Sequence, residues 1–272
     1  YRPWQHQYGW VNHFEMANFL SGTKSQVYVD APAAMMFPGD PGFPDKGMHR
    51  GHMMLFAPRI GLVFDPRGTG KEVVRAGYGL FYDYPPASYN IRVSNSLPYG
   101  GQVTLTNPSL PDPWINQPGG NPFPIPLANK NLVFPQNGTY YSQPLDLPNS
   151  YTQQWNLSVQ RQFGNDWSVD LSYLGNKATH IWADRQANPV IYIPGSSTTA
   201  TANIASRRLL TMLNPTVGPY YNSIIETVPG GNISYNGMVV KVQKRFSGRF
   251  TVQSNYTLGH CISDMDPDQF LD

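Results

Sequence analysis

The feature that most constrains this chain is a strict alternation of apolar and polar residues, which comes in pairs of segments. Residues 235–246 and 250–260 both alternate, and only Ser-Gly-Arg at 247–249 separates them. Successive side chains of a β-strand point to opposite faces of a sheet. The pattern therefore predicts a β-hairpin with one apolar and one polar face. In its second strand the apolar residues are Phe250, Val252, Tyr256 and Leu258.

Two further segment pairs repeat this pattern. Residues 153–163 and 167–174 flank a Gly-Asn-Asp turn, and residues 54–64 and 73–82 flank a turn at 65–70. The predicted hairpins span about 53–82, 153–174 and 235–260. Each strand has about the 9–11 residues that cross a bilayer at the usual tilt. We therefore expect an all-β fold of antiparallel hairpins.

The connections between these hairpins differ sharply from the turns within them. Residues 83–150 and 175–234 are rich in Pro, Gly, Asn and Ser and show no sustained period. Loops of this length are unusual inside a compact soluble domain. Short turns at one end and long loops at the other are typical of outer-membrane barrels, with periplasmic turns and extracellular loops. We interpret residues 1–272 as part of a transmembrane β-barrel in the bacterial outer membrane.

Composition supports a lipid-facing sheet over a soluble one. Charged residues make up 13% of the chain, against about 25% in soluble domains. Composition alone also permits a secreted, Tyr-rich β-sandwich. Aromatic residues at both ends of the predicted strands favour the membrane, where they form interfacial belts. Those beside the turns are Phe64, Phe163, Trp167, Phe246 and Phe250, and those at the far ends are Tyr82, Tyr151, Trp155, Tyr173, Tyr235 and Tyr256.

The polar faces of the hairpins supply the candidate site. In a barrel wall the face opposite the lipid lines the lumen. The residues we expect there are Arg75, Lys241, Gln243, Arg245, Gln253 and Asn255. The loops 83–150 and 175–234 would then form the external, ligand-facing surface.

Other functions find little support in the sequence. The stretch 68–71 (Gly-Thr-Gly-Lys) lacks the first glycine and the Ser/Thr of a phosphate loop, and no Gly-x-Ser-x-Gly motif exists. We therefore expect no enzyme. The net charge of +2 is too small to indicate nucleic acid. Asp264, Asp266 and Asp268 have the spacing of a calcium loop without its glycine, so no cofactor is predicted, and calcium is the one ion worth testing.

Several motifs resemble one family. Residues 57–66 (Ala-Pro-Arg-Ile-Gly-Leu-Val-Phe-Asp-Pro) and 74–83 (Val-Arg-Ala-Gly-Tyr-Gly-Leu-Phe-Tyr-Asp) resemble a signature of the Oar-like TonB-dependent receptors, abundant in acidobacteria. The resemblance covers most of residues 30–268. Further matching stretches lie at 154–161, 172–177, 207–210, 234–237 and 255–261.

The resemblance implies a barrel of about 22 strands that holds a plug and takes up a scarce ligand with energy from the TonB complex. Neither a plug nor a TonB box is recognisable here, so the chain is expected to be a fragment of the barrel region. The partners implied are outer-membrane lipid, the remaining strands, the plug and TonB.

Two alternatives remain open at this point. The chain could be a β-rich extracellular assembly or surface-interaction protein whose open strand edges pair between copies. It could also be a secreted β-fold hydrolase or carbohydrate binder that uses exposed Tyr and Trp.

Overall fold

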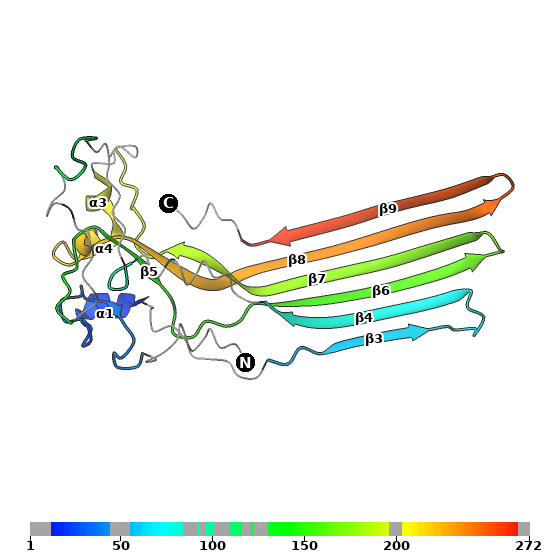
Figure 1. Cartoon of the computed structure of the whole chain (residues 1–272), viewed down its shortest axis with the longest axis horizontal. Helices are drawn as coiled ribbons and strands as arrows, with labels where there is room; N and C mark the ends of the chain where they lie inside the picture. Colours follow the sequence, from blue (N-terminus) through cyan, green and yellow to red (C-terminus); the bar gives the residue numbers. More distant parts are fainter. Residues whose placement is uncertain are drawn as a thin grey trace.

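The computed structural model describes residues 12–43, 55–83, 92, 96–100, 109–115, 121, 130–195 and 203–265. These residues form a long β-sheet, here called the arm, and a smaller packed region at one end, here called the head (Figure 1). The strands of the arm are β3 (Arg59–Phe64), β4 (Glu72–Tyr82), β6 (Tyr151–Phe163), β7 (Trp167–Gln186), β8 (Tyr221–Ser247) and β9 (Phe250–Ser263).

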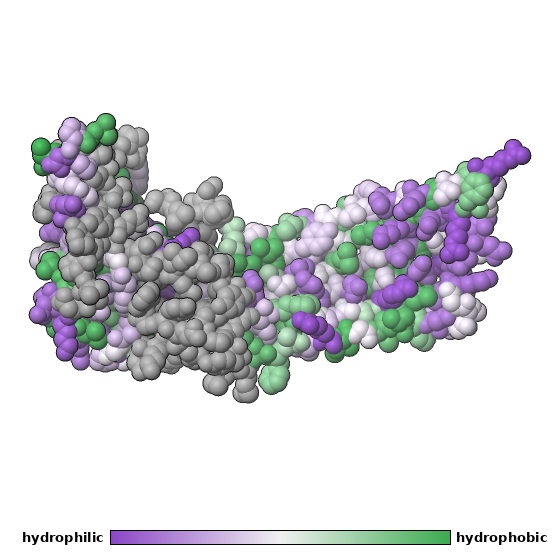
Figure 2. Space-filling model, viewed as in Figure 1, coloured by the Kyte–Doolittle hydropathy of each residue, from purple (hydrophilic) through white to green (hydrophobic). Residues whose placement is uncertain are grey.

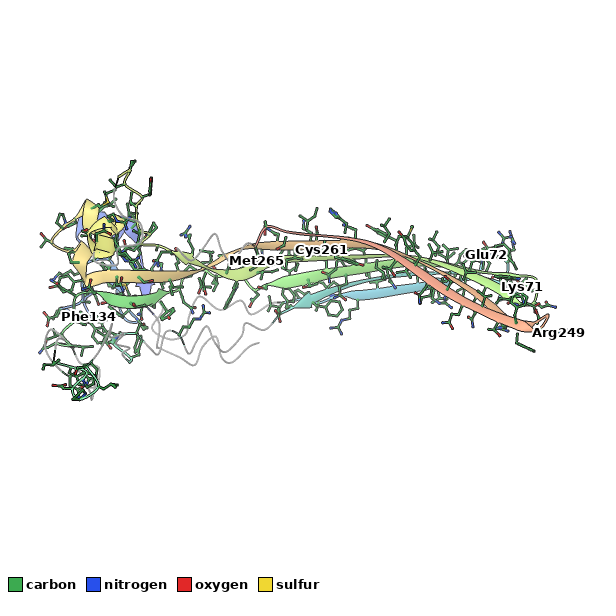
Figure 3. All side chains as sticks on the ribbon, turned by 90° about the horizontal axis from the view of Figure 1, so that it is seen from above. Lys71, Glu72, Phe134, Arg249, Cys261 and Met265 are labelled. Carbon is green, nitrogen blue, oxygen red and sulfur yellow. The ribbon has the colours of Figure 1, made fainter. Side chains whose placement is uncertain are left out.

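The arm is an antiparallel meander in sequence order. Its hydrogen-bonded pairs are β3 with β4, β4 with β6, β6 with β7, β7 with β8, and β8 with β9. The three predicted hairpins are therefore confirmed, and so is the all-β, antiparallel fold. Figure 3 shows the arm as a single layer that carries side chains on both sides.

The predicted boundaries of the loop 175–234 are wrong. β7 continues to Gln186, β8 begins at Tyr221, and the two strands pair as far as Gln186 with Ile225. Register shifts between Ala178 and Ala183, together with Pro-Gly-Gly at 229–231, interrupt the period in this stretch. The long hairpin thus projects past the roughly 9–11 residues that a bilayer requires.

The head contains the shorter elements. They are β1 (His13–Phe14), α1 (Met16–Ser21), β2 (Met35–Met36), β5 (Gly138–Ser142), α3 (Ile204–Arg207), α4 (Leu209–Leu213) and η3 (Gly218–Tyr220). The described parts of the two predicted loops are therefore not wholly irregular. β5, inside the predicted loop 83–150, pairs in parallel with the outer part of β8.

A hydrophobic core holds the head together. Tyr221, at the start of β8, lies 5.6 Å from Phe14 and 5.5 Å from Tyr140 between ring centroids, and it is 1% exposed. Its hydroxyl donates to the carbonyl of Ala33 at 2.5 Å. The core thus joins the N-terminal segment to β5 and β8. Its other members include Phe19, Ala31, Ala34, Met35, Phe37, Leu132, Phe134, Leu210 and Ile224.

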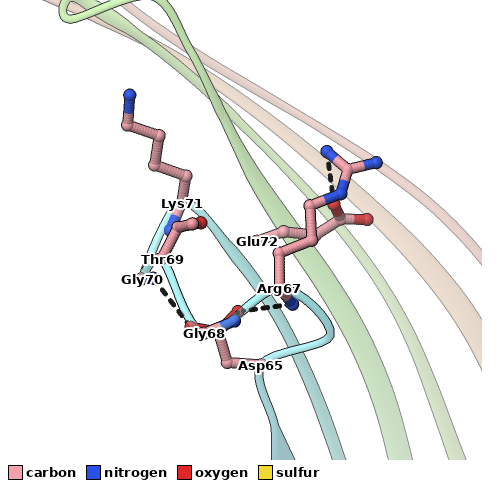
Figure 4. A network of polar contacts seen from close by, with 7 residues as sticks. All are labelled: Asp65, Arg67, Gly68, Thr69, Gly70, Lys71 and Glu72. Atoms are coloured by element: carbon pink, nitrogen blue, oxygen red, sulfur yellow. Dashed lines mark hydrogen bonds and ion pairs between the residues drawn. The ribbon is translucent and has the colours of Figure 1, made fainter.

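The turn between β3 and β4 is built around one carboxylate. Asp65 accepts backbone hydrogen bonds from Gly70 at 2.7 Å, Gly68 at 2.9 Å and Arg67 at 3.2 Å (Figure 4). An ion pair of 3.3 Å between Arg67 and Glu72 closes the turn. These hydrogen bonds, that of Gly70 above all, hold the pKa of Asp65 below its ordinary value of 3.8.

Asp65→Asn is expected to destabilise this turn in a pH-dependent way. Because the pKa of Asp65 is lower in the folded than in the unfolded state, its stabilisation is complete above the unfolded value of 3.8. It is lost as the pH falls through the folded value. The difference in urea midpoint between wild type and variant should therefore shrink in acid. Asp30→Asn, at an exposed carboxylate without a described hydrogen bond, is the control. A difference that is constant with pH would contradict the prediction.

Candidate functional site

The register divides the arm into two chemically distinct faces. Residues that pair across neighbouring strands share a face, so each row of paired residues can be assigned as a whole. On one face, two successive rows are apolar. They are Phe64, Val74, Val159, Leu171, Val240 and Tyr256, and Leu62, Ala76, Leu157, Tyr173, Met238 and Leu258.

The apolar face is exposed along its length. Leu62 is 59% exposed, Leu171 47% and Leu258 56%. Soluble monomers rarely expose continuous apolar patches of more than a few hundred Å². This face is therefore suited to contact with hydrocarbon.

The opposite face is polar, and it carries all six candidate residues. Arg75 lies in a row with Ser158, Ser172 and Thr257, which also contains Val63 and Val239, and Lys241 pairs with Asn255. Gln243 pairs with Gln253, and Arg245 lies two residues further along the same side of β8. The register places Arg75, Lys241, Gln243, Gln253 and Asn255 on one face, and Arg245 lines a cavity with Arg75 and Gln243. That this face lines a lumen stays a prediction. Figure 2 shows hydrophilic side chains gathered at the turn end of the arm.

Three of the six candidates line one cavity at the turn end. It has a volume of about 180 Å³, and Arg75, Gln243 and Arg245 contribute to it. Lys71, which the sequence did not single out, also lines it and is placed by the turn before β4. The remaining lining includes Gly70, Val73, Gln160, Gln162, Asn165, Asp166, Trp167 and Ser168. Lys241, Gln253 and Asn255 lie on the same face outside this cavity.

A shallower groove of about 460 Å³ lies further from the turns. Gly77 and Gly79 form part of its floor, and Arg59, Phe81 and Tyr235 stand beside it. The Arg59 guanidinium carbon lies 4.6 Å from the centroid of the Phe81 ring. The groove presents rings and amide side chains, in contrast to the cationic cavity.

The prediction that Tyr235 belongs to the second, lipid-facing aromatic belt is wrong. It pairs with Asn176 and Cys261, which places it on the polar face. There its ring covers Gly237 and Gly259, where an added Cβ would come within 2.5 and 2.7 Å of the Tyr235 hydroxyl. An aromatic ring over glycine restores packing that the missing side chain would supply. Tyr235 therefore fills the polar face and does not belong to a lipid-facing belt.

These faces agree with the comparison to known proteins. A family described as "Outer membrane beta barrel domain" matches residues 2–271. The chain belongs to this family. It is accordingly located in the outer membrane, and the expected localisation is confirmed.

A solved structure of the same kind is also similar. The crystal structure of the outer membrane transporter YddB from Escherichia coli aligns with a TM-score of 0.46 and 10% identity. The alignment covers 79% of this chain and 21% of that chain. No curated protein matches. Among the residues that the structure describes, no helix is long and apolar enough to span a membrane.

The apolar face of the arm has an unexpected cation at its turn end. Lys244 pairs with Trp167 and Val252, so its Cα lies on the apolar face. Its ammonium lies 4.0 Å from the Phe250 centroid and donates to the Ser247 carbonyl at 2.6 Å and hydroxyl at 2.8 Å. The Lys244 side chain thus buries its aliphatic stem and directs its ammonium group into the turn between β8 and β9. The alternation pattern could not reveal this, because Lys244 occupies an apolar position.

The head contains a buried polar network around Asn188. Its amide nitrogen donates to the carbonyls of Tyr221 at 2.9 Å and Asn222 at 3.2 Å, and its amide oxygen accepts from the Leu210 backbone at 2.9 Å. Arg208 donates to the Asn188 carbonyl at 2.8 Å, and burial lowers the pKa of Arg208. This explains the Arg-Arg-Leu-Leu motif at 207–210: it ties the segment after β7 to the start of β8.

Of the three carboxylates in the calcium hypothesis, the structure describes that of Asp264. The Asp264 carboxylate accepts from the backbone of Asn232 at 2.5 Å and from its side chain at 2.8 Å, which lowers the pKa of Asp264. Asp266 and Asp268 lie outside the described residues. Within the described ranges, no group of three or more His, Cys, Asp or Glu side chains lies together.

Proposed function

We propose that the chain is part of the barrel wall of a TonB-dependent receptor that binds a ligand and takes it up across the outer membrane. The observation that carries this proposal is the two-faced single-layer arm. Its exposed apolar rows suit lipid, and its polar rows suit a lumen through which a solute passes. The proposal assigns no catalysis to the chain.

The motif resemblance supports the receptor type. Most of the matching stretches coincide with strands of the arm, since 57–66 includes β3 and 74–83 covers most of β4, whereas 207–210 lies in the head. The glycines of these motifs also have local roles. In the stretch 172–177, an added Cβ at Gly175 would come within 2.0 Å of the Trp155 ring. The motifs thus specify close packing of the wall.

The orientation follows from the ends of the arm. The short turns would face the periplasm, and the head, carried on the projecting β7–β8 hairpin, would face outward. The six long strands are fewer than the roughly eight needed to close a barrel. Both β3 and β9 have an edge without a partner strand among the described residues. We propose that further strands and a plug of the parent protein complete the wall, and that the TonB complex energises it.

A retention experiment tests the receptor type. The full-length protein, extracted from outer membranes in detergent, is expected to migrate faster on gels before heating than after. Immobilised on a support, it should retain the purified C-terminal domain of TonB. Another outer-membrane barrel that transports without TonB serves as the control. Heat-modifiable migration without retention of TonB would leave a barrel but contradict the receptor assignment.

The competing assembly hypothesis rests on the open strand edges. Strand edges with unpaired backbone groups can pair with another copy of the chain. In that case ordered oligomers should persist when detergent is removed, and the protein should not depend on lipid for its fold. Extraction solely in detergent would favour the barrel wall.

A further inference from the structure

The cavity at the turn end of the polar face collects more positive than negative charge. Lys71, at the end of the turn before β4, and Arg75, within β4, come from one segment, and Arg245 comes from β8, so two segments distant in sequence supply three cations. Asp166, from the turn between β6 and β7, is the acidic residue in the lining. Like charges brought together raise the free energy of the fold unless an opposite charge compensates them.

Asp166 already forms hydrogen bonds with other groups. Its carboxylate accepts a hydrogen bond from the Ser247 hydroxyl, and its carbonyl accepts from the Arg245 backbone at 2.8 Å. Within the described residues, no ion pair joins a carboxylate to Lys71, Arg75 or Arg245. The lining of the cavity therefore contains three cations and one carboxylate, and that carboxylate is already hydrogen-bonded within the turns.

Amide side chains beside the cations are held in defined orientations. Arg75 donates to the Gln160 side-chain oxygen at 3.1 Å, which leaves the Gln160 amide nitrogen free to donate elsewhere. The Gln162 amide nitrogen donates to the carbonyls of Gly164 at 3.3 Å and Asn165 at 3.4 Å. The backbone of Lys71 is also fixed, since its carbonyl accepts from the Gln162 backbone at 2.8 Å. The Arg75 guanidinium and the Gln160 amide are thus held by each other, and the backbone that carries Lys71 is held by β6.

We propose that this cavity binds the oxyanion group of a small solute, a carboxylate or a phosphate. Guanidinium and ammonium groups form charge-assisted hydrogen bonds with such oxygens, and the amide nitrogen of Gln160 adds a neutral donor. The cavity, of about 180 Å³, is large enough for the anionic group of a solute. This site depends on the geometry of the sheet and not on energised transport, so it goes beyond the proposed function.

Titration calorimetry of the full-length protein in neutral detergent at low ionic strength tests the site, with inorganic phosphate and acetate as probes. Saturable binding of either probe is expected, and the preferred probe identifies the group. Arg245→Gln and Lys71→Gln should each weaken binding about tenfold, the typical effect of losing one charge-assisted hydrogen bond. Added salt should weaken binding because the three cations are exposed.

Lys24→Gln is the control, because Lys24 is an exposed cation between α1 and β2 in the head, at the other end of the arm from the cavity (Figure 1). It should leave the affinity within about twofold, since the 13 residues of β6 alone span about 43 Å, which exceeds the Debye length of about 30 Å at 0.01 M salt. Each variant is first checked for heat-modifiable migration, so that loss of binding is read from folded protein. Lys71 lies in a turn, which keeps one variant informative if Arg245→Gln fails to fold. Equal weakening by Lys24→Gln, or no saturable binding of either probe by the folded wild type, would overturn the proposal.

Discussion

Replacement of Leu171 by arginine is expected to keep the protein out of the outer membrane, whereas arginine at Ser172 is tolerated. Leu171 lies in the apolar row between Val159 and Val240 and is 47% exposed. Arginine in the middle of the lipid face of a barrel costs about 2–4 kcal/mol. Natural domains have a total stability of only about 5–15 kcal/mol, and a loss of about 2 kcal/mol or more lowers the ratio of folded to unfolded protein at least about 30-fold, which should reduce assembly into the membrane.

Ser172 makes this comparison specific to the face. It follows Leu171 on the same strand, and it lies in the polar row between Ser158 and Val239. Its hydroxyl donates to Asp170 at 2.6 Å, so an arginine there has a carboxylate nearby. The measurement is the amount of heat-modifiable protein in the outer-membrane fraction. Equal losses for the two variants would mean that the apolar face is not the lipid face.

Asn188→Ala is expected to open the head while the arm stays folded. The substitution leaves the Leu210 amide without its acceptor, and it removes donors from the Tyr221 and Asn222 carbonyls. Asn188 is 0% exposed, so water does not replace these hydrogen bonds without rearrangement. A buried polar group left without a partner costs about 1–3 kcal/mol. The start of β8 and α4 should therefore separate.

Hydrogen exchange with mass spectrometry distinguishes the two regions. Peptides from 204–226 should exchange faster in Asn188→Ala than in wild type. The exchange of peptides from β6 and β9 should not change. Asn255→Ala, which removes an exposed amide of β9 on the polar face, serves as the control. Faster exchange throughout the arm would show that head and arm fold as one unit, contrary to the prediction.

Alternation predicted the arm because one physical rule acts at every position. A side chain in a single-layer sheet meets lipid on one face and a polar environment on the other, so its polarity records its face. Arg75, Lys241, Gln243, Gln253 and Asn255 were assigned to one face by this rule, and the register agrees. The rule misplaced Tyr235, because an aromatic residue suits a belt as well as a glycine-lined surface. It also missed Lys244, which occupies an apolar position because its long aliphatic stem carries the ammonium group away from the apolar face and into the turn.

The head could not be predicted in the same way. Tyr221 contacts Phe14 and Tyr140 across long stretches of sequence, and β5 joins β8 in parallel. Such contacts leave no local period, because each segment packs against partners that are distant in the chain. For the same reason, Arg245 joins Lys71 and Arg75 around one cavity only because β6 and β7 bring the end of β8 beside the start of β4.

The paired alternation itself determined the hairpins, their two faces and their short turns, because strand geometry links each residue's polarity to its side. The tertiary structure alone decided how far β7 and β8 project, which residues form the core of the head, and which cations meet in one cavity. Those properties depend on packing and register between distant segments, and residue order along a single strand does not encode them.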